Sequence, residues 1–134
     1  MANKTSDTGM ALGQLTLRLG ASGLLIYGHG WPKLTHFAQR AAHFPDPLHV
    51  GHTLSLSLVV FAEVVCAGAV ALGLLTRLAV IPLLIFFGVA AFVQNGAAPF
   101  ADKELALIFA VPYIGIALIG PGRFSVDAAR GGAR

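Results

Sequence analysis

Residues 78–101 read LAVIPLLIFFGVAAFVQNGAAPFA, a stretch without a charged side chain. A helix that crosses a hydrocarbon core of about 30 Å needs about 20 apolar residues, and this stretch is long enough to do so. Three further stretches have a comparable length: 10–31 and 54–75 contain one charge each, and 105–122 contains none. The fold class predicted is an all-α membrane protein, a bundle of four transmembrane helices. We expect the helices at about 10–30, 51–75, 77–95 and 102–120.

The composition of the whole chain agrees with a membrane environment. Hydrophobic residues make up 56% of the 134 residues and charged residues only 11%, whereas a soluble domain has roughly 25% charged residues. This length suits one domain, which we place at 1–134. The net charge of +3 could suggest nucleic acid, but the basic residues are scattered at segment ends and form no stripe. We therefore predict the lipid bilayer as a partner and no nucleic acid.

Basic residues predict the orientation of the bundle, because they are more frequent on the cytoplasmic side of membrane proteins. Six lie on the side of the two termini: Lys4, Arg18, Arg77, Arg123, Arg130 and Arg134. Three lie on the other side: Lys33, Arg40 and Lys103. The sequence therefore predicts cytoplasmic N- and C-termini and a multi-pass protein of the cell's inner membrane.

Two charged residues fall inside predicted spans, Arg18 in the first and Glu63 in the second. A charge at the centre of the bilayer costs at least about 2.5–3.5 kcal/mol, so each should face the bundle and find a partner. The two residues have similar predicted depths, which favours an Arg18–Glu63 pair. Such a pair is either a structural clasp or part of a proton or quinone site, and both interpretations stay open.

A second group of polar residues is predicted at the outer ends of the helices. His29 and Lys33 are four residues apart and share a face if the first helix continues through Pro32. Gln94 ends the third helix and Glu104 begins the fourth at the same level. Polar groups that converge from several helices are typical of a ligand site within a bundle, although each alone is explained by contact with headgroups and water.

Other ligands are less well supported by the pattern. Tyr27 and Trp31 could hold a flat quinone ring, or could simply belong to the aromatic belt at the membrane interface. His29 and His52 could ligate a haem, but no spacing fixes that geometry, and the loop histidines lack the tight spacing of a metal site. A haem or a metal is therefore disfavoured, and a quinone as cofactor stays a hypothesis at this point.

Several short motifs occur in a fixed order between the hydrophobic spans. They are Leu17-Arg18-Leu19, His29-Gly30-Trp31-Pro32-Lys33-Leu34, Glu63, Gly73-Leu74-Leu75-Thr76-Arg77-Leu78, Glu104-Leu105-Ala106-Leu107 and Gly120-Pro121-Gly122-Arg123-Phe124-Ser125-Val126-Asp127. In these motifs the chain resembles the DoxX family of four-helix membrane proteins. One departure is Gln94-Asn95, which stands where relatives often carry a histidine near the end of the third helix.

The resemblance implies a role like that of the membrane subunit of thiosulfate:quinone oxidoreductase. We therefore expect a subunit of a quinone-linked redox system, an oxidoreductase that depends on a partner protein and could form homo-oligomers. In this hypothesis Lys33 polarises a quinone oxygen, His29 relays a proton and Glu104 leads to the periplasm. The alternative is a non-catalytic membrane anchor or assembly partner for a periplasmic redox protein. A small-solute carrier is disfavoured, because four short spans leave little room for inverted repeats.

Overall fold

The computed structural model describes residues 4–131, and within this range the chain forms helices, turns and loops but no strands. The first helical rod runs without interruption from Lys4 to Thr35. It consists of α1 (Lys4–Leu25), the π-helical segment η1 (Ile26–Gly30) and α2 (Trp31–Thr35). Pro32 lies in the first turn of α2, where its missing N–H breaks few hydrogen bonds, so the rod passes through it.

The second and third rods are joined by a tight turn. α4 (His52–Val60), η2 (Phe61–Cys66) and α5 (Ala67–Leu72) form the second rod, and α6 (Thr76–Gly88) with η3 (Val89–Gln94) forms the third. Gly73 at the turn has a φ of 71°, a left-handed conformation that glycine adopts without steric cost. The remaining helices are α3 (Phe37–Ala41) in the long loop, α7 (Phe100–Ile119) and the short C-terminal α8 (Val126–Ala129).

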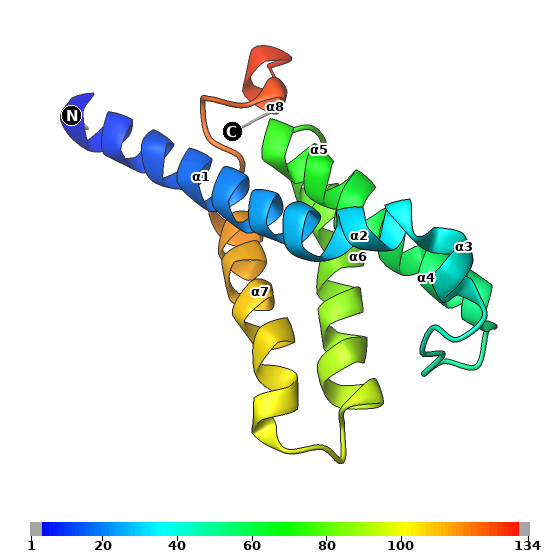
Figure 1. Cartoon of the computed structure of the whole chain (residues 1–134). Helices are drawn as coiled ribbons and strands as arrows, with labels where there is room; N and C mark the ends of the chain where they lie inside the picture. Colours follow the sequence, from blue (N-terminus) through cyan, green and yellow to red (C-terminus); the bar gives the residue numbers. More distant parts are fainter. Residues whose placement is uncertain (1–3, 132–134) are drawn as a thin grey trace.

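The rods pack as two layers that diverge at one end. α6 and α7 lie side by side as an antiparallel hairpin, whereas the α1–α2 rod crosses this hairpin and packs along α5 and α4 (Figure 1). Away from the termini, α2 and α4 diverge from α6 and α7, and the long loop between α3 and α4 lies at that end (Figure 1). This divergence leaves space between the second and third rods.

Small and apolar side chains fill the centre of the bundle. The core contains Leu25, Ala62, Cys66, Ala67, Val70, Val80, Leu83, Phe87, Tyr113 and Ile116. Ala62, Cys66 and Ala67 on the second rod are buried and small, which allows the helices to approach closely, as expected where lipid removes the hydrophobic drive for association. Large apolar residues on every rod are more than half exposed, which suits contact with lipid: examples are Leu24, Val65, Ile85, Phe92, Val111 and Leu118.

Three of the rods are long and apolar enough to cross a membrane: Lys4–Thr35, His52–Leu72 and Thr76–Gln94. The structure thus confirms an all-helical membrane protein. The fourth predicted span is α7, a helix of 20 residues. It carries Asp102, Lys103 and Glu104 near its beginning, so its charge-free part starts only at Leu105. Arg134, one of the basic residues used for the orientation, lies outside the described residues.

Candidate functional site

A buried ion pair joins the first and second rods. Lys33 Nζ lies 3.0 Å from Oε1 and 2.8 Å from Oε2 of Glu63, and it donates a hydrogen bond to each oxygen. The side chain of Glu63 is 3% exposed and that of Lys33 is 15% exposed. Glu63 is thus shielded almost completely from its surroundings, and Lys33 lies between it and the exterior.

The local backbone explains why these two side chains meet. Gly30 lies against Glu63 so closely that a Cβ at this position would be 2.9 Å from the Glu63 carbonyl oxygen. Helical side chains point toward the N-terminus of their own helix, so Lys33 reaches back over this contact toward the carboxylate. Gly30 and Glu63 belong to η1 and η2, which contact each other. π-helical segments inside α-helices occur frequently at functional sites.

The predicted Arg18–Glu63 pair is wrong. Arg18 is 2% exposed, but its guanidinium donates only to main-chain oxygens of the second rod and the C-terminal segment. The acceptors are Val70 (3.1 Å), Ala71 (3.0 Å), Pro121 (2.7 Å) and Phe124 (3.1 Å from each of two nitrogens). The helix α5 ends beside it, where unpaired carbonyls carry partial negative charge. Arg18 is therefore a structural anchor at the termini end of the bundle, on another level from Glu63.

The same end is held by Asp127, whose carboxylate accepts hydrogen bonds from Leu75 N (2.8 Å), Thr76 N (3.0 Å) and Thr76 Oγ1 (2.8 Å). These bonds satisfy free N–H groups at the start of α6. Burial raises the pKa of Asp127, but the hydrogen bonds from Thr76 and Leu75 outweigh it and hold that pKa below its usual range. The motifs around Arg18, Thr76 and Asp127 are thus parts of one structural unit.

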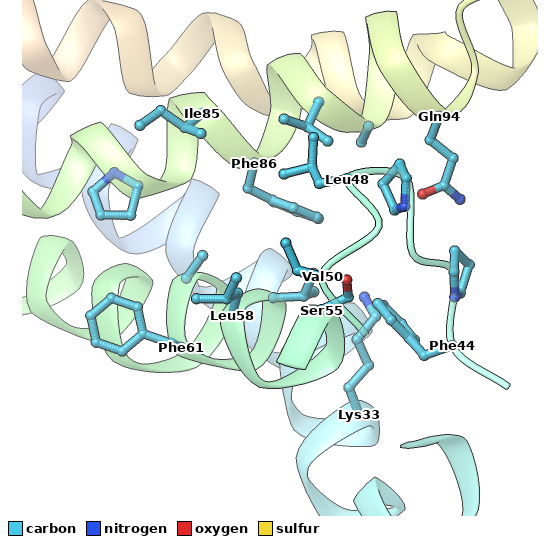
Figure 2. Close-up of a pocket in the computed structure, with 17 residues that line it drawn as sticks. Lys33, Phe44, Leu48, Val50, Ser55, Leu58, Phe61, Ile85, Phe86 and Gln94 are labelled. Carbon is cyan, nitrogen blue, oxygen red and sulfur yellow. The ribbon is translucent and has the colours of Figure 1, made fainter. Parts of the chain in front are cut away.

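A pocket of about 490 Å³ lies between the second and third rods, near the long loop. Its walls are mostly apolar and include three aromatic rings, and its polar groups are Lys33, Ser55 and Gln94. Figure 2 shows Lys33 and Gln94 reaching toward the loop end of the pocket from different elements, with Phe61 and Ile85 at the opposite end. The remaining lining residues are Phe44, Pro45, Pro47, Leu48, Val50, Leu58, Val59, Ala62, Pro82, Phe86, Val89 and Ala90.

One wall of the pocket is the loop itself, which Asp46 holds in place. Its carboxylate accepts hydrogen bonds from Val50 N (2.9 Å), Gly51 N (2.8 Å) and Ser55 Oγ (2.7 Å). The hydrogen bond from Ser55 is the largest influence on the Asp46 carboxyl and, with those of the two amides, lowers its pKa. The loop is therefore attached to the start of α4, with Leu48 and Val50 turned into the pocket (Figure 2).

Only part of the predicted outer cluster comes together here. Lys33 and Gln94 line the pocket and Glu63 is bound to Lys33, whereas His29, Tyr27, Trp31 and Glu104 are not among the lining residues. The ring of His29 packs edge-on against Phe109 of α7, with centroids 5.6 Å apart. Tyr27 is 84% exposed and Trp31 55% exposed, which suits a position facing lipid or the interface. The roles proposed for His29 and Glu104 stay predictions.

Nothing in the sequence analysis pointed directly to the loop as a wall of the pocket. Asp46, Ser55 and the apolar loop residues were not predicted as site residues, although the loop is unusually rich in phenylalanine and proline for a solvated connection. Within residues 4–131, no group of three or more His, Cys, Asp or Glu side chains could hold a metal ion. His52, considered as a haem ligand, has its Nδ1 within hydrogen-bonding distance of the Phe44 carbonyl oxygen.

These features define a class: a multi-pass helical membrane protein with a ligand-sized pocket between its helices and a buried ion pair beside that pocket. The family model described as DoxX matches residues 13–96, more than half of the chain. The chain belongs to the DoxX family. The match begins within α1, covers the rest of the first rod and all of the second and third, which contain the ion pair and the pocket, and ends before α7. No curated protein and no solved structure gives a significant match.

Proposed function

We propose that this protein is the membrane subunit of a quinone-linked redox system and that the pocket between the second and third rods binds the quinone ring. The observation that carries the proposal is the pairing of a ligand-sized, mainly apolar pocket with two separate hydrogen-bond donors, Lys33 and Gln94. Small-molecule sites have volumes of about 300–1,000 Å³ and combine apolar walls with a few polar groups. Proteins of the DoxX family are often associated with redox systems, which favours a quinone over other flat ligands.

The donors match the chemistry of a quinone, which carries two carbonyl acceptors on a flat apolar ring. Two ammonium hydrogens of Lys33 bond to Glu63, so the third is available to a ligand oxygen. The amide of Gln94 is more exposed and lies on a different rod, so it can donate to the other oxygen. Phe44, Phe61 and Phe86 supply aromatic surface for the ring.

The reaction requires a partner that supplies electrons. Reduction of the quinone consumes two electrons and two protons, and each carbonyl oxygen becomes a hydroxyl. In this proposal the electrons come from a redox centre of a partner protein at the outer face, the protons come from water at the same face, and Lys33 hydrogen-bonds to one carbonyl oxygen of the ring. Homo-oligomers are compatible with this arrangement, since the pocket lies within one chain.

The proposal includes the orientation of the protein in the inner membrane. Four helices cross the bilayer, with α7 as the fourth span, whose charged first turn lies at the outer interface. Both termini are cytoplasmic, because Lys4, Arg77, Arg123 and Arg130 lie at the beginning of α1, at the beginning of α6 and on either side of α8. The pocket then opens in the outer half of the membrane, where quinones dissolved in lipid reach it between the second and third rods.

Filling the pocket tests the proposal. Ala90 lines the pocket, so Ala90→Trp should occupy it and abolish saturable binding of a short-chain benzoquinone to the purified protein. Val93 lies in the same segment η3 but is 53% exposed and outside the pocket, so Val93→Trp is the matched control and should bind like the wild type. Equal binding by both variants, or no binding to the wild type, would leave the non-catalytic anchor as the better account.

A further inference from the structure

The two residues of the ion pair lie at different distances from the pocket. Lys33 lines the pocket, whereas Glu63 does not line it and lies behind Lys33, with a side chain only 3% exposed. A ligand in the pocket therefore contacts the ammonium group and not the carboxylate. The carboxylate nevertheless lies 2.8 Å from the ammonium nitrogen, so it offsets the positive charge of the ammonium at that end of the pocket.

The two charges cancel at the wall of the pocket. The Lys33–Glu63 pair has a total charge of zero when Lys33 is an ammonium beside the Glu63 carboxylate. The total is also zero when the shared proton lies on Glu63 and Lys33 is a neutral amine. The third hydrogen of Lys33 remains a donor for an uncharged acceptor such as a carbonyl oxygen. The wall thus offers a hydrogen bond without an excess positive charge.

We infer that Glu63 determines which ligands the pocket accepts: it restricts the site to electrically neutral head groups and excludes anionic amphiphiles such as fatty acids. This inference rests on the proposed function and specifies the ligand class of the same site. Glu63 acts through Lys33 and is a positioning residue rather than a catalytic one. Without it, a lone lysine at the end of an apolar pocket would attract the carboxylates that are abundant among lipids.

The same geometry makes the binding of an anionic ligand at Lys33 unfavourable. A ligand carboxylate at Lys33 would bring a second negative charge to an ammonium that Glu63 already holds with two hydrogen bonds. Either the anions repel each other in a site of low dielectric constant, or Glu63 loses its partner while buried, and both are unfavourable. Asp46, bonded to the lining residue Ser55, adds another carboxylate near the loop end.

Ligand selectivity measures this effect separately from folding. The full-length protein in a non-ionic detergent is titrated with two probes of similar size, a short-chain benzoquinone and decanoate. The wild type should prefer the quinone, and Glu63→Gln, which leaves Lys33 unpaired, should raise decanoate affinity relative to quinone affinity by about tenfold or more. Asp102 is exposed and outside the pocket, so Asp102→Asn should leave the ratio unchanged.

The outcomes separate the inference from the proposed function. If the wild type binds no quinone, the proposed function itself is wrong. If it binds quinone but Glu63→Gln leaves the ratio unchanged, or the wild type binds decanoate as well as quinone, the inference is overturned and the function stands. If Glu63→Gln does not fold, the double variant Lys33→Gln/Glu63→Gln is measured, because it also has no net charge. It should keep the preference for the quinone, and a preference for decanoate would overturn the inference.

Discussion

Gly30 and Glu63 bring the backbones of the first two rods close together: a Cβ on Gly30 would lie 2.9 Å from both the carbonyl oxygen of Glu63 and Cγ2 of Val64. Real Cβ atoms do not approach other heavy atoms so closely, so any larger residue must push the rods apart. This contact sets the distance that Lys33 spans to reach the carboxylate. The ion pair and the packing of the two rods therefore depend on each other.

Gly30→Val should lower the stability of the protein by about 1–3 kcal/mol or more, because overpacking here moves backbone and not only side chains. Gly28 lies in the same segment, and a Cβ there meets no atom within 4 Å, so Gly28→Val is the control. Thermal unfolding in detergent measures both. Equal melting temperatures for the two variants would contradict the close contact.

Arg18→Lys should destabilise the protein by at least about 3 kcal/mol. Lysine keeps the positive charge but cannot reach four carbonyl groups at once. Each buried carbonyl that is left without a hydrogen bond costs about 1–3 kcal/mol. The C-terminal segment should also become more sensitive to protease. Arg77 is exposed and makes one hydrogen bond, to Ala117 O, so Arg77→Lys should change stability by about 0.5 kcal/mol or less. A stable Arg18→Lys protein would show that the anchor is dispensable.

Asp127 should make the stability of the protein depend on pH. Its pKa is lower in the folded protein than its usual value of about 3.9, so its contribution is complete above that value and is lost as the pH falls through the folded pKa. Asp127→Asn should lower the stability of the protein at neutral pH. The variant should also lose less stability than the wild type as the pH falls below about 4. Asp102→Asn is the control, because that carboxylate accepts no hydrogen bond within residues 4–131. Parallel acid limbs for wild type and Asp127→Asn would contradict this role.

The orientation is tested by single cysteines. Cys66 is the one cysteine in the sequence and is buried, so background labelling of intact cells by a membrane-impermeant maleimide should be low. His43→Cys in the long loop should be labelled in intact cells, whereas Ala128→Cys should be labelled only after lysis. Labelling of Ala128→Cys in intact cells would reverse the proposed topology.

The all-helical membrane fold could be predicted from the sequence, because the length and charge content of each hydrophobic stretch report on membrane spanning, and three such spans are found among the described residues. The family could be predicted from the short motifs between the hydrophobic stretches. The partners of the buried charges could not be predicted from the sequence. Arg18 meets the second rod at Val70 and Ala71, whereas Glu63 lies opposite Gly30 and Lys33, about three turns farther along the first rod. Lys33, predicted at the outer end of a helix, instead reaches the buried Glu63 from within a continuous rod.

The pocket depends on features that hydropathy does not carry. The close approach at Gly30 sets how the first and second rods are shifted along each other. The sequence does not reveal which neighbour a glycine in a membrane helix contacts. His29 contacts Phe109 and Lys33 contacts Glu63, so these two residues, four apart in the sequence, have different partners. The sequence therefore identified Lys33, Glu63 and Gln94 as site candidates but not the loop wall that completes the pocket.

The central claim, that a quinone ring binds between the second and third rods, is tested most directly by photolabelling with an azido-benzoquinone followed by mass spectrometry of the peptides. The label should be found in the loop around Phe44–Val50 and in η3 around Ala90, it should be displaced by unmodified quinone, and it should be lost in Ala90→Trp but not in Val93→Trp. Labelling concentrated around the exposed Tyr27 and Trp31, or labelling that excess quinone does not displace, would contradict the account.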